Sequence, residues 1–544
     1  MVLNSTPVPI PGKKITYKTA PNGTVYVYYT LRAYRNKHGN PTSDEIAIGK
    51  KDPSTGMLIP NRKYFELFES STELGDKKSL ISKKSPIFPD RVASYGNTYS
   101  LLEIAESTGL RELLEECFPE KWQEILITSF YMLCEGNVMM YLDDWFDETD
   151  IPLQLCGVTE ERMNDQQCSR LFASLSYGER LHFLEEWVKL RSENEYIAYD
   201  VTSISSYSTE IDNVAWGYNR DNERLPQINL GIFYEFESSL PVYYEMYNGS
   251  IVDKSHLPYM VAERLAIKNI RLVFDCGMVT EPNLKYMDKH KHFFVTSFPG
   301  HLVDAKLIID SCKDGIRKSA NRINEFDVYA IPTNIEIYDF QMVAHVYFDT
   351  NKQSFDEREL YSRIEKLQAD LEKIGKRKRV TKKYTDLFMV EEKEAELSFM
   401  LDNDKIDEKL SRTGFFILMT NDLNLSSRDV LKIYRGRGII EENFDQLKND
   451  LDFRRLRTHI NETTDGKVFV GFIALIIRSY LVNKIKGSQK TKKFTIKKIF
   501  NEFRKIKTIT FEGSRRMMMP LTKLQKDILE AMGISHEKLL KTLE

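Results

Sequence analysis

The stretch LKIYRGRGIIEENFDQLKNDL, residues 431–451, carries four polar side chains at offsets of zero, three, seven and fourteen residues. These side chains are Tyr434, Arg437, Glu441 and Lys448. On a continuous helix, with about 100° of rotation per residue, all four fall within an arc of roughly 60°. A carboxylate flanked by two cations and a phenol suits a metal and a phosphate. From spacing alone, a solvated helix face with charge pairs is the simpler interpretation.

Two glycines within this stretch weaken the argument for one helix face. Gly436 and Gly438 each cost a helix about 1 kcal/mol relative to alanine, so a helix can break or start there. In that case Glu441 and Lys448 still share a face, whereas Tyr434 and Arg437 approach the ligand from a bend.

Two further acids occur earlier in the chain, on segments with the pattern of β-strands. In 196–205 (YIAYDVTSIS), period-two alternation places Asp200 in mid-strand, on a face with small neighbours. The apolar run 272–274 is typical of a strand buried on both faces, and Asp275 follows it directly. Carboxylates at strand ends beside a glycine turn are a favoured place for sites in α/β sheets. Each acid alone is more simply a structural residue, but the order strand, strand, helix is informative.

This order resembles ribonuclease-H-like folds, in which carboxylates from the first strand, the fourth strand and a late helix meet around divalent metals. The spacing from Tyr434 to Lys448 resembles the YREK motif of the DDE transposases of bacterial insertion sequences, in the insertion-sequence-4 superfamily. Asp200-Val201-Thr202 is similar to the first-aspartate motif of that family, and Asp275-Cys276-Gly277 to the second. The runs GYNRDNERLPQINLG and YNGSIVDKSHL between the two aspartates also resemble the family. The close resemblance covers residues 190–300 and 415–485.

The resemblance implies catalysis by a DNA transposase. Asp200, Asp275 and Glu441 would be the catalytic acids and would hold two Mg²⁺ ions, with Mn²⁺ as a substitute. Tyr434, Arg437 and Lys448 would bind DNA phosphates. The reaction would be cleavage at transposon ends followed by strand transfer, by a cut-and-paste route. Two alternatives remain open: a ribonuclease-H-like nuclease that cuts without joining, and a DNA-binding regulator without catalysis.

The same resemblance implies the partners and the location. The expected partners are the transposon terminal inverted repeats and target DNA, bound by a homodimer in the synaptic complex, with no membrane. The expected location is the bacterial cytoplasm, in association with the nucleoid. Six cysteines without a CxxC pair agree with a reducing compartment and free thiols. The longest apolar run, 468–477, ends at Arg478 and predicts a buried helix.

Charge is distributed unevenly along the 544 residues, although the net charge is only −3. Residues 101–200 contain 22 acidic and 7 basic side chains, whereas residues 484–516 contain 12 basic and 2 acidic ones. A strongly basic segment within a nearly neutral chain is expected where contact with a polyanion is local.

The patterns predict an α/β fold: a ribonuclease-H-like core with a mainly β insertion, N-terminal β and helical domains, and a basic helical C-terminus. In the N-terminal part, basic residues interleaved with aromatics could hold a DNA backbone, or form a solvated sheet face. Ser354 and Glu357 predict a capping box at the start of a helix, and 402–404 predicts a hairpin turn. The predicted parts are an N-terminal β-rich domain at 1–88, a helical domain at 89–192, the first part of the core at 193–300, the β-rich insertion at 301–414, the second part of the core at 415–485 and the C-terminal region at 486–544.

Overall fold

The chain falls into two compact units, residues 1–88 and residues 89–544. The structure is a computed structural model. It describes residues 7–36, 39–68, 89–155, 157–191, 196–219, 221, 223–251, 270–299, 305–373, 381–392, 397–438, 447–449, 451–511 and 516–541.

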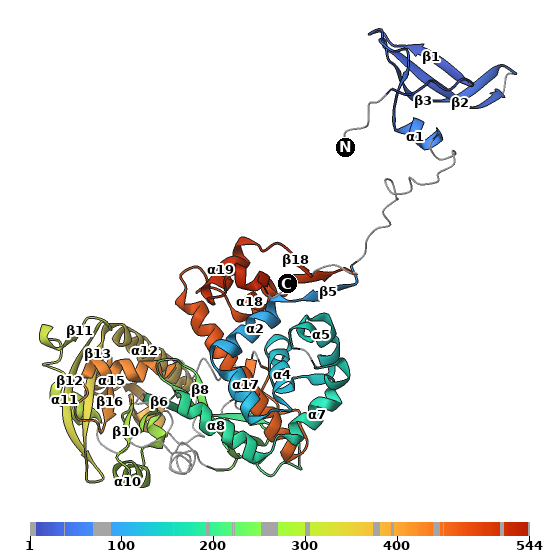
Figure 1. The fold of residues 1–544 in the computed structure, drawn as a ribbon. Helices are drawn as coiled ribbons and strands as arrows, with labels where there is room; N and C mark the ends of the chain where they lie inside the picture. Colours follow the sequence, from blue (N-terminus) through green and yellow to red (C-terminus); the bar gives the residue numbers. More distant parts are fainter. Residues whose placement is uncertain are drawn as a thin grey trace. The chain divides into compact units, whose positions relative to one another are not determined.

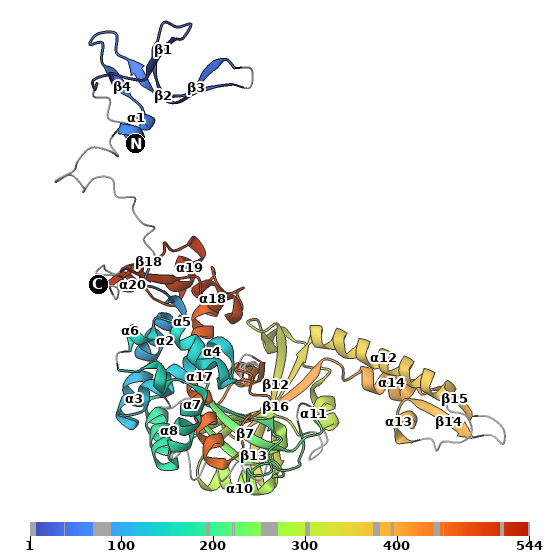
Figure 2. The ribbon, with the colours of Figure 1, turned by 90° about the vertical axis from the view of Figure 1, so that its right-hand side faces the viewer.

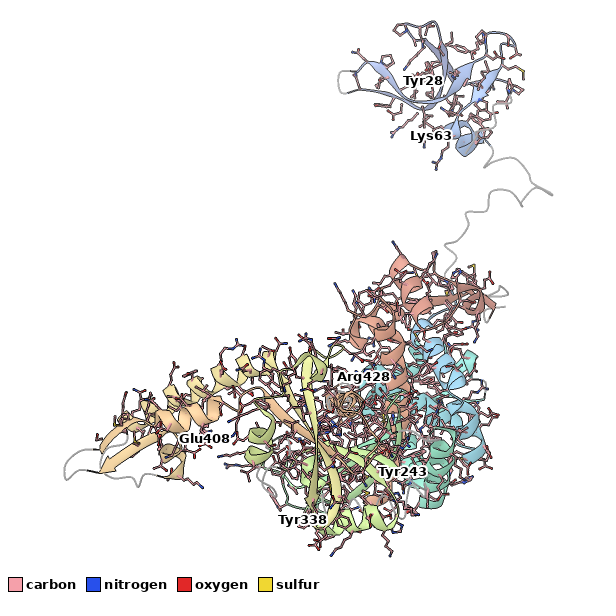
Figure 3. The ribbon with its side chains drawn as sticks, turned by 90° about the vertical axis from the view of Figure 1, so that its left-hand side faces the viewer. Tyr28, Lys63, Tyr243, Tyr338, Glu408 and Arg428 are labelled. Atoms are coloured by element: carbon pink, nitrogen blue, oxygen red, sulfur yellow. The ribbon has the colours of Figure 1, made fainter. Side chains whose placement is uncertain are left out.

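The first unit is a four-stranded antiparallel sheet followed by a short helix. In sequence order its elements are β1 (Ile15–Thr19), β2 (Val25–Arg35), β3 (Pro41–Lys51), β4 (Leu58–Pro60) and α1 (Arg62–Phe68). Val27, Ile48 and Leu58 are fully buried and form its small core. The other face of β2 carries Tyr28, labelled in Figure 3, with the Lys18 amine 4.4 Å from its ring centroid.

The second unit contains a helical layer built around one long helix, α17 (Asn461–Gly487). This helix is apolar on all sides, and it is long and apolar enough to cross a membrane, but 83% of its most apolar stretch is buried inside the protein. An all-round apolar helix is expected in a core, and the prediction of a buried helix at 468–477 is confirmed. The helices of the preceding part, several of which pack against α17 (Figure 1), are α2 (Gly96–Ser107), α3 (Leu110–Cys117), α4 (Trp122–Glu135), α5 (Leu142–Glu148), α6 (Ile151–Gln154), α7 (Asp165–Ser174) and α8 (Tyr177–Arg191).

A nine-stranded mixed sheet is the centre of the second unit, in the order β11-β12-β13-β16-β10-β9-β6-β7-β8. Strands β6, β9 and β10 run parallel to one another, and all other neighbours are antiparallel. The prediction of an α/β fold is therefore confirmed. The strand bounds are β6 (Tyr196–Ser205), β7 (Gln227–Glu235), β8 (Pro241–Asn248), β9 (Arg271–Phe274), β10 (Phe293–Ser297), β11 (Arg322–Ile323), β12 (Val328–Ile337), β13 (Phe340–Asp349) and β16 (Phe415–Thr420).

Helices cover both faces of this sheet. On one face, α15 (Ser427–Gly436) packs against β10, β12 and β16. On the other, α11 (Ala305–Cys312) packs on alternate residues of β13, Ala344 and Val346 among them. Helix α10 (Glu281–Lys289) connects β9 to β10. Because the chain crosses by a helix between these two parallel strands, their carboxyl ends lie at the same edge of the sheet.

The predicted insertion consists of two structurally different pieces. Strands β11 to β13 extend the central sheet, whereas the following elements form an arm with its own apolar cluster (Figure 2). Glu408, labelled in Figure 3, lies in the arm on α14. The elements of the arm are α12 (Thr350–Lys373), α13 (Lys382–Thr385), β14 (Phe388–Glu392), β15 (Leu397–Leu401) and α14 (Asn403–Leu410).

Two local predictions in the arm are wrong. Helix α12 begins at Thr350 and not at Ser354, because Asp349 Oδ1 already accepts the N–H of Asn351 at 2.8 Å. Asp402 does not start a hairpin turn but caps helix α14, where its side chain accepts the N–H of Lys405 at 3.2 Å. Asp favours turns and helix N-caps for the same reason, a carboxylate that accepts nearby backbone N–H groups.

The basic C-terminal part is not wholly helical, so that prediction is wrong in part. Strand β17 (Lys507–Thr510) lies between α18 (Ile496–Phe503) and α19 (Lys523–Ala531) in the chain. It pairs with β5 (Arg91–Ser94) and with β18 (Met517–Met518). The last described helix is α20 (His536–Lys541). The β-branched run Thr508, Ile509 and Thr510 favours a strand over a helix.

Candidate active site

Asp200 and Asp275 are placed by neighbouring parallel strands. β6 and β9 pair in register from Tyr196 opposite Arg271 to Ala198 opposite Val273. Continuing this register by two residues sets Asp275, the first residue after β9, beside Asp200 on one side of the sheet. The acid in mid-strand and the acid at the strand end are therefore neighbours.

Each carboxylate is oriented by the backbone N–H of the residue that follows it. Asp200 Oδ1 accepts from Val201 at 2.8 Å, and Asp275 Oδ1 accepts from Cys276 at 2.7 Å. The hydroxyl of Ser297, at the end of β10, lies 3.5 Å from the same Asp275 oxygen. The side chains of Asp200 and Asp275 are 22% and 54% exposed, so a ligand from solvent can reach both.

One guanidinium group bridges the two carboxylates. Arg437 Nη2 lies 3.7 Å from Asp200 Oδ2, and Arg437 Nη1 lies 3.7 Å from Asp275 Oδ1. The same Nη1 donates to the hydroxyl of Tyr434 at 3.4 Å. The Arg437 side chain is only 13% exposed. Four of the six predicted site residues thus meet at one place.

Helix α15, which carries Tyr434, is fixed at its first turn. The Ser426 side chain accepts the N–H of Asp429 at 3.2 Å and so caps the start of the helix. His345 Nδ1 lies 2.8 Å from the Ser427 hydroxyl, and the Tyr347 hydroxyl donates to the Ser427 carbonyl at 2.7 Å. Two side chains of β13 therefore hold the helix on the sheet. Arg428, the next residue, is labelled in Figure 3.

The other end of α15 is set by a glycine. The helix ends at Gly436, where a methyl group would overlap the ring of Phe236, the residue after β7. The missing side chain lets the helix end approach the sheet, and this close approach brings Arg437 to the carboxylates. The end of α15 at Gly436 agrees with the alternative of a break at the glycines. Residues 439–446, through which one continuous face would run to Lys448, lie outside the described residues.

Lys448 and Glu441, the remaining two predicted residues, have different outcomes. Glu441 lies outside the described residues. Lys448 is buried, and its Nζ lies 2.6 Å from Asp221 Oδ2 in the connection between β6 and β7. The same connection is held by Arg455, whose two terminal nitrogens lie 2.6 and 3.0 Å from the oxygens of Glu223. Sequence reasoning missed both acids as partners, although both stand in the run GYNRDNERLPQINLG.

A positive group that interacts with Tyr234, a neighbour of Asp200 on the sheet, was also missed. Tyr234 of β7 points to the same side of the sheet as Asp200, because it pairs with Ala198. Burial raises the pKa of Tyr234 well above its usual value, the charge of Asp200 raises it further, and the positive charge of Arg478 opposes the rise. Arg478 is 3% exposed on α17. The only sequence signal for it was an arginine that interrupts an apolar run.

The donor atoms suit a hard divalent cation. The carboxylate oxygens of Asp200 and Asp275 and the hydroxyl of Ser297 are the ligand type that Mg²⁺ and Mn²⁺ prefer. The position of Arg437 between the two acids means that one cationic group can interact with both. Within the residues that the structure describes, no three His, Cys, Asp or Glu side chains gather as a metal site. The two described acids fit a metal, and the third predicted ligand is Glu441.

The sequence was also compared with models of protein families. The model described as "Transposase DDE domain" matches residues 191–477, from just before β6 to within α17. The chain belongs to the DDE-domain transposase family. The matched range contains all six predicted site residues, and the resemblance to DDE transposases is confirmed at this level.

Other comparisons add little to the description of the transposase. A search of curated proteins found no match. Among solved structures, the cryo-EM structure of a piggyBac transposase synaptic complex with hairpin DNA is similar over 70% of this chain and 69% of that chain, with 11% identity and a TM-score of 0.34. A likeness at that level supports no further argument.

Proposed function

We propose that this transposase cleaves DNA at transposon ends and transfers the strands to target DNA by a cut-and-paste route. Asp200, Asp275 and Glu441 would hold two Mg²⁺ ions, which Mn²⁺ can replace. The observation that carries the proposal is the convergence of Asp200 and Asp275 on one guanidinium, at 3.7 Å each, within the matched domain.

The order and direction of five strands support a ribonuclease-H-like core. Along the sheet the order is β8-β7-β6-β9-β10, with β8, β7 and β6 antiparallel and β6, β9 and β10 parallel. In chain order, Asp200 is on the first of these strands and Asp275 follows the fourth. This is the placement expected of two acids in that fold.

The side chains of the site have separate tasks. When bound, the two cations would activate water or a 3′-hydroxyl and stabilise the leaving oxygen. Arg437 presents two nitrogens in a fixed fork, which matches two phosphate oxygens. Tyr434 accepts a hydrogen bond from Arg437 and so limits the orientations of the guanidinium. Lys448 would act as a point charge on a phosphate after it leaves Asp221.

The spacing of Tyr434, Arg437, Glu441 and Lys448 supports membership of the YREK group of the insertion-sequence-4 superfamily. Joining two ends requires a homodimer on the terminal inverted repeats. The five free cysteines that the structure describes agree with a bacterial cytoplasmic location.

Substitution of the acids tests the proposal. In Mg²⁺, Asp200→Asn and Asp275→Asn should each lower cleavage of transposon-end DNA by about 10³-fold or more, equivalent to ~4 kcal/mol of transition-state stabilisation. Asp407→Asn, at an exposed position on α14, is the matched control and should cleave as the wild type does. Wild-type rates in either folded acid variant would refute the proposal.

A precut transposon end separates the alternatives. A transposase joins such an end to target DNA, whereas a nuclease only cuts, and a regulator leaves intact and precut substrates unchanged. Release of cut products without joined products would favour the nuclease.

A further inference from the structure

Asn137, two residues after the end of α4, is a buried side chain that holds a segment of the matched domain. It is 0% exposed and stands outside the matched range 191–477. Its side-chain nitrogen Nδ2 donates to the carbonyl of Asp452 at 3.0 Å and to the carbonyl of Arg455 at 3.3 Å. One amide from the helical part therefore binds two carbonyls of the segment 451–457, which follows Lys448 in the chain.

Helix α17 holds both Asn137 and this segment. The amine of Lys467, which is 4% exposed, donates to the backbone carbonyl of Asn137 at 3.0 Å. One turn later on the same helix, a methyl group on Gly471 would overlap the ring of Phe453. Residues four apart lie on the same side of a helix, so the amide and the segment rest on one side of α17.

The segment has a backbone conformation that needs support from its surroundings. Asp452 and Arg457 have left-handed φ angles of 56° and 52°, which residues with a side chain seldom adopt. The Arg457 guanidinium donates to Asp452 Oδ2 at 2.7 Å. Such conformations persist where contacts enforce them. Loss of the amide that binds the carbonyls of Asp452 and Arg455 should therefore allow the segment to take another path.

The path of the segment affects Lys448 and the strand of Asp200. The N–H of Phe453 donates to the carbonyl of Leu447 at 3.1 Å, and Leu447 directly precedes Lys448. The N–H of Leu456 lies 3.4 Å from the carbonyl of Ser205, the last residue of β6. The segment is thus bonded at one end to the turn that carries Lys448 and at the other to the strand that carries Asp200.

We propose that Asn137 is a positioning residue for the DNA reaction. Through the carbonyls of Asp452 and Arg455 it sets the path of residues 451–457, and this path places Lys448 where it can bind a DNA phosphate. The inference rests on the proposed function, because it takes Lys448 as a phosphate ligand. A contribution of Asn137 to stability alone is the alternative that the experiment must separate.

The test measures how DNA binding depends on salt, with the full chain in EDTA so that no cleavage occurs. Binding of a fluorescein-labelled transposon-end duplex is followed by anisotropy over a range of KCl concentrations. Each phosphate contact adds about 0.9 to the slope of log K against log salt, or about eightfold in affinity at ~0.1 M salt. Lys448→Met should lose one contact by both measures. Asn137→Ala should reproduce both losses, and the double variant should lose no further slope.

Asn321→Ala is the matched control. The Asn321 amide donates to the carbonyls of Gly315 and Ile316, each at 3.1 Å, in the connection between α11 and β11. The substitution removes the same pair of hydrogen bonds away from Lys448. It should lower the thermal midpoint, as Asn137→Ala should, but leave the salt slope of the wild type. A difference in slope between the two variants therefore reports positioning, since loss of stability is common to both.

If Asn137→Ala does not fold, Asn137→Ser replaces it with the same expected slope, because the short hydroxyl cannot reach both carbonyls. A folded Asn137 variant with the wild-type slope would overturn the inference. A double variant that loses the sum of the two single losses would also overturn it, since Asn137 would then act independently of Lys448. If Lys448→Met itself keeps the wild-type slope, the phosphate contact in the proposed function fails too, whereas a failure confined to Asn137 leaves that function intact.

Discussion

Replacing Arg437 by glutamine should tighten metal binding while it weakens catalysis. In the structure the guanidinium lies 3.7 Å from a carboxylate oxygen of Asp200 and 3.7 Å from one of Asp275. At an effective dielectric constant near 20, a contact of that length is worth about 4 kcal/mol before screening. Asp275 is 54% exposed, so its contact contributes about 1 kcal/mol or less. A cation that binds the two acids must compete with both contacts.

We therefore expect that the contacts of Arg437 cost metal binding about 2–3 kcal/mol, so that Arg437→Gln binds Mn²⁺ roughly 30–150-fold more tightly. Electron paramagnetic resonance of free Mn²⁺, titrated into the protein without DNA, measures this affinity directly. Cleavage of transposon-end DNA should fall in the same variant, because glutamine cannot grip a phosphate as arginine does. Opposite changes in the two measurements distinguish competition from simple loss of structure.

Arg435→Gln is the matched control for this prediction. Arg435 is in the last turn of the same helix and lies 3.8 Å from Asp349, with its side chain 43% exposed. It should leave Mn²⁺ affinity within about twofold of wild type. Unchanged or weaker Mn²⁺ binding in folded Arg437→Gln would refute the reasoning, since it would mean that Arg437 arranges the carboxylates for the metal instead of competing with it.

Three further predictions concern the surroundings of the site. Gly436→Ala should destabilise the protein by about 1–3 kcal/mol through overlap with Phe236, and Phe236→Ala in the same chain should recover part of the loss in a double-mutant cycle. Burial lowers the pKa of His345 to about 4, below the value near 6.5 in the unfolded chain. The contribution of neutral His345 to the free energy of unfolding is therefore complete above about pH 6.5 and is lost toward pH 4. The difference in thermal midpoint between the wild type and His345→Asn should accordingly become smaller from pH 7.5 to pH 5. Burial lowers the pKa of Lys467 to about 8, and its amine donates to the Asn137 carbonyl at 3.0 Å. Since the unfolded chain binds more protons than the folded one between about pH 8 and 10.4, the wild type should gain stability relative to Lys467→Met from pH 7 to pH 9.5. For either pair, a difference in stability between wild type and variant that is the same at both pH values would contradict the prediction.

Local periodicity predicted those helices and strands whose pattern of apolar and polar residues lies within the element itself. The strand predicted at 196–205 has the bounds of β6, and the apolar run 272–274 lies within β9. Long-range pairing was not predictable in this way. Nothing local indicates that β17 pairs with β5, more than 400 residues earlier in the chain, or that β11 to β13 extend the central sheet.

The candidate site was predictable to the same extent. The acids could be placed on their strands, because alternation and a buried apolar run are local patterns. The bridging role of Arg437 depends on the close contact between Gly436 and Phe236, which only the folded chain creates. The pairing of Lys448 with Asp221 joins residues 227 positions apart. The catalytic roles of these residues stay predictions, since proximity alone does not show turnover.

The folded chain changes the interpretation of the basic C-terminal segment. Arg504 pairs with Glu135, and Arg516 pairs with Asp150, which is almost fully buried. Lys538, farther along, pairs with Glu103. Three acids of the helical part, Glu103, Glu135 and Asp150, therefore face basic residues from the C-terminal part, and paired side chains have less to gain from a phosphate than free ones. An excess of charge in a sequence predicts polyanion contact only where the fold leaves that charge unpaired.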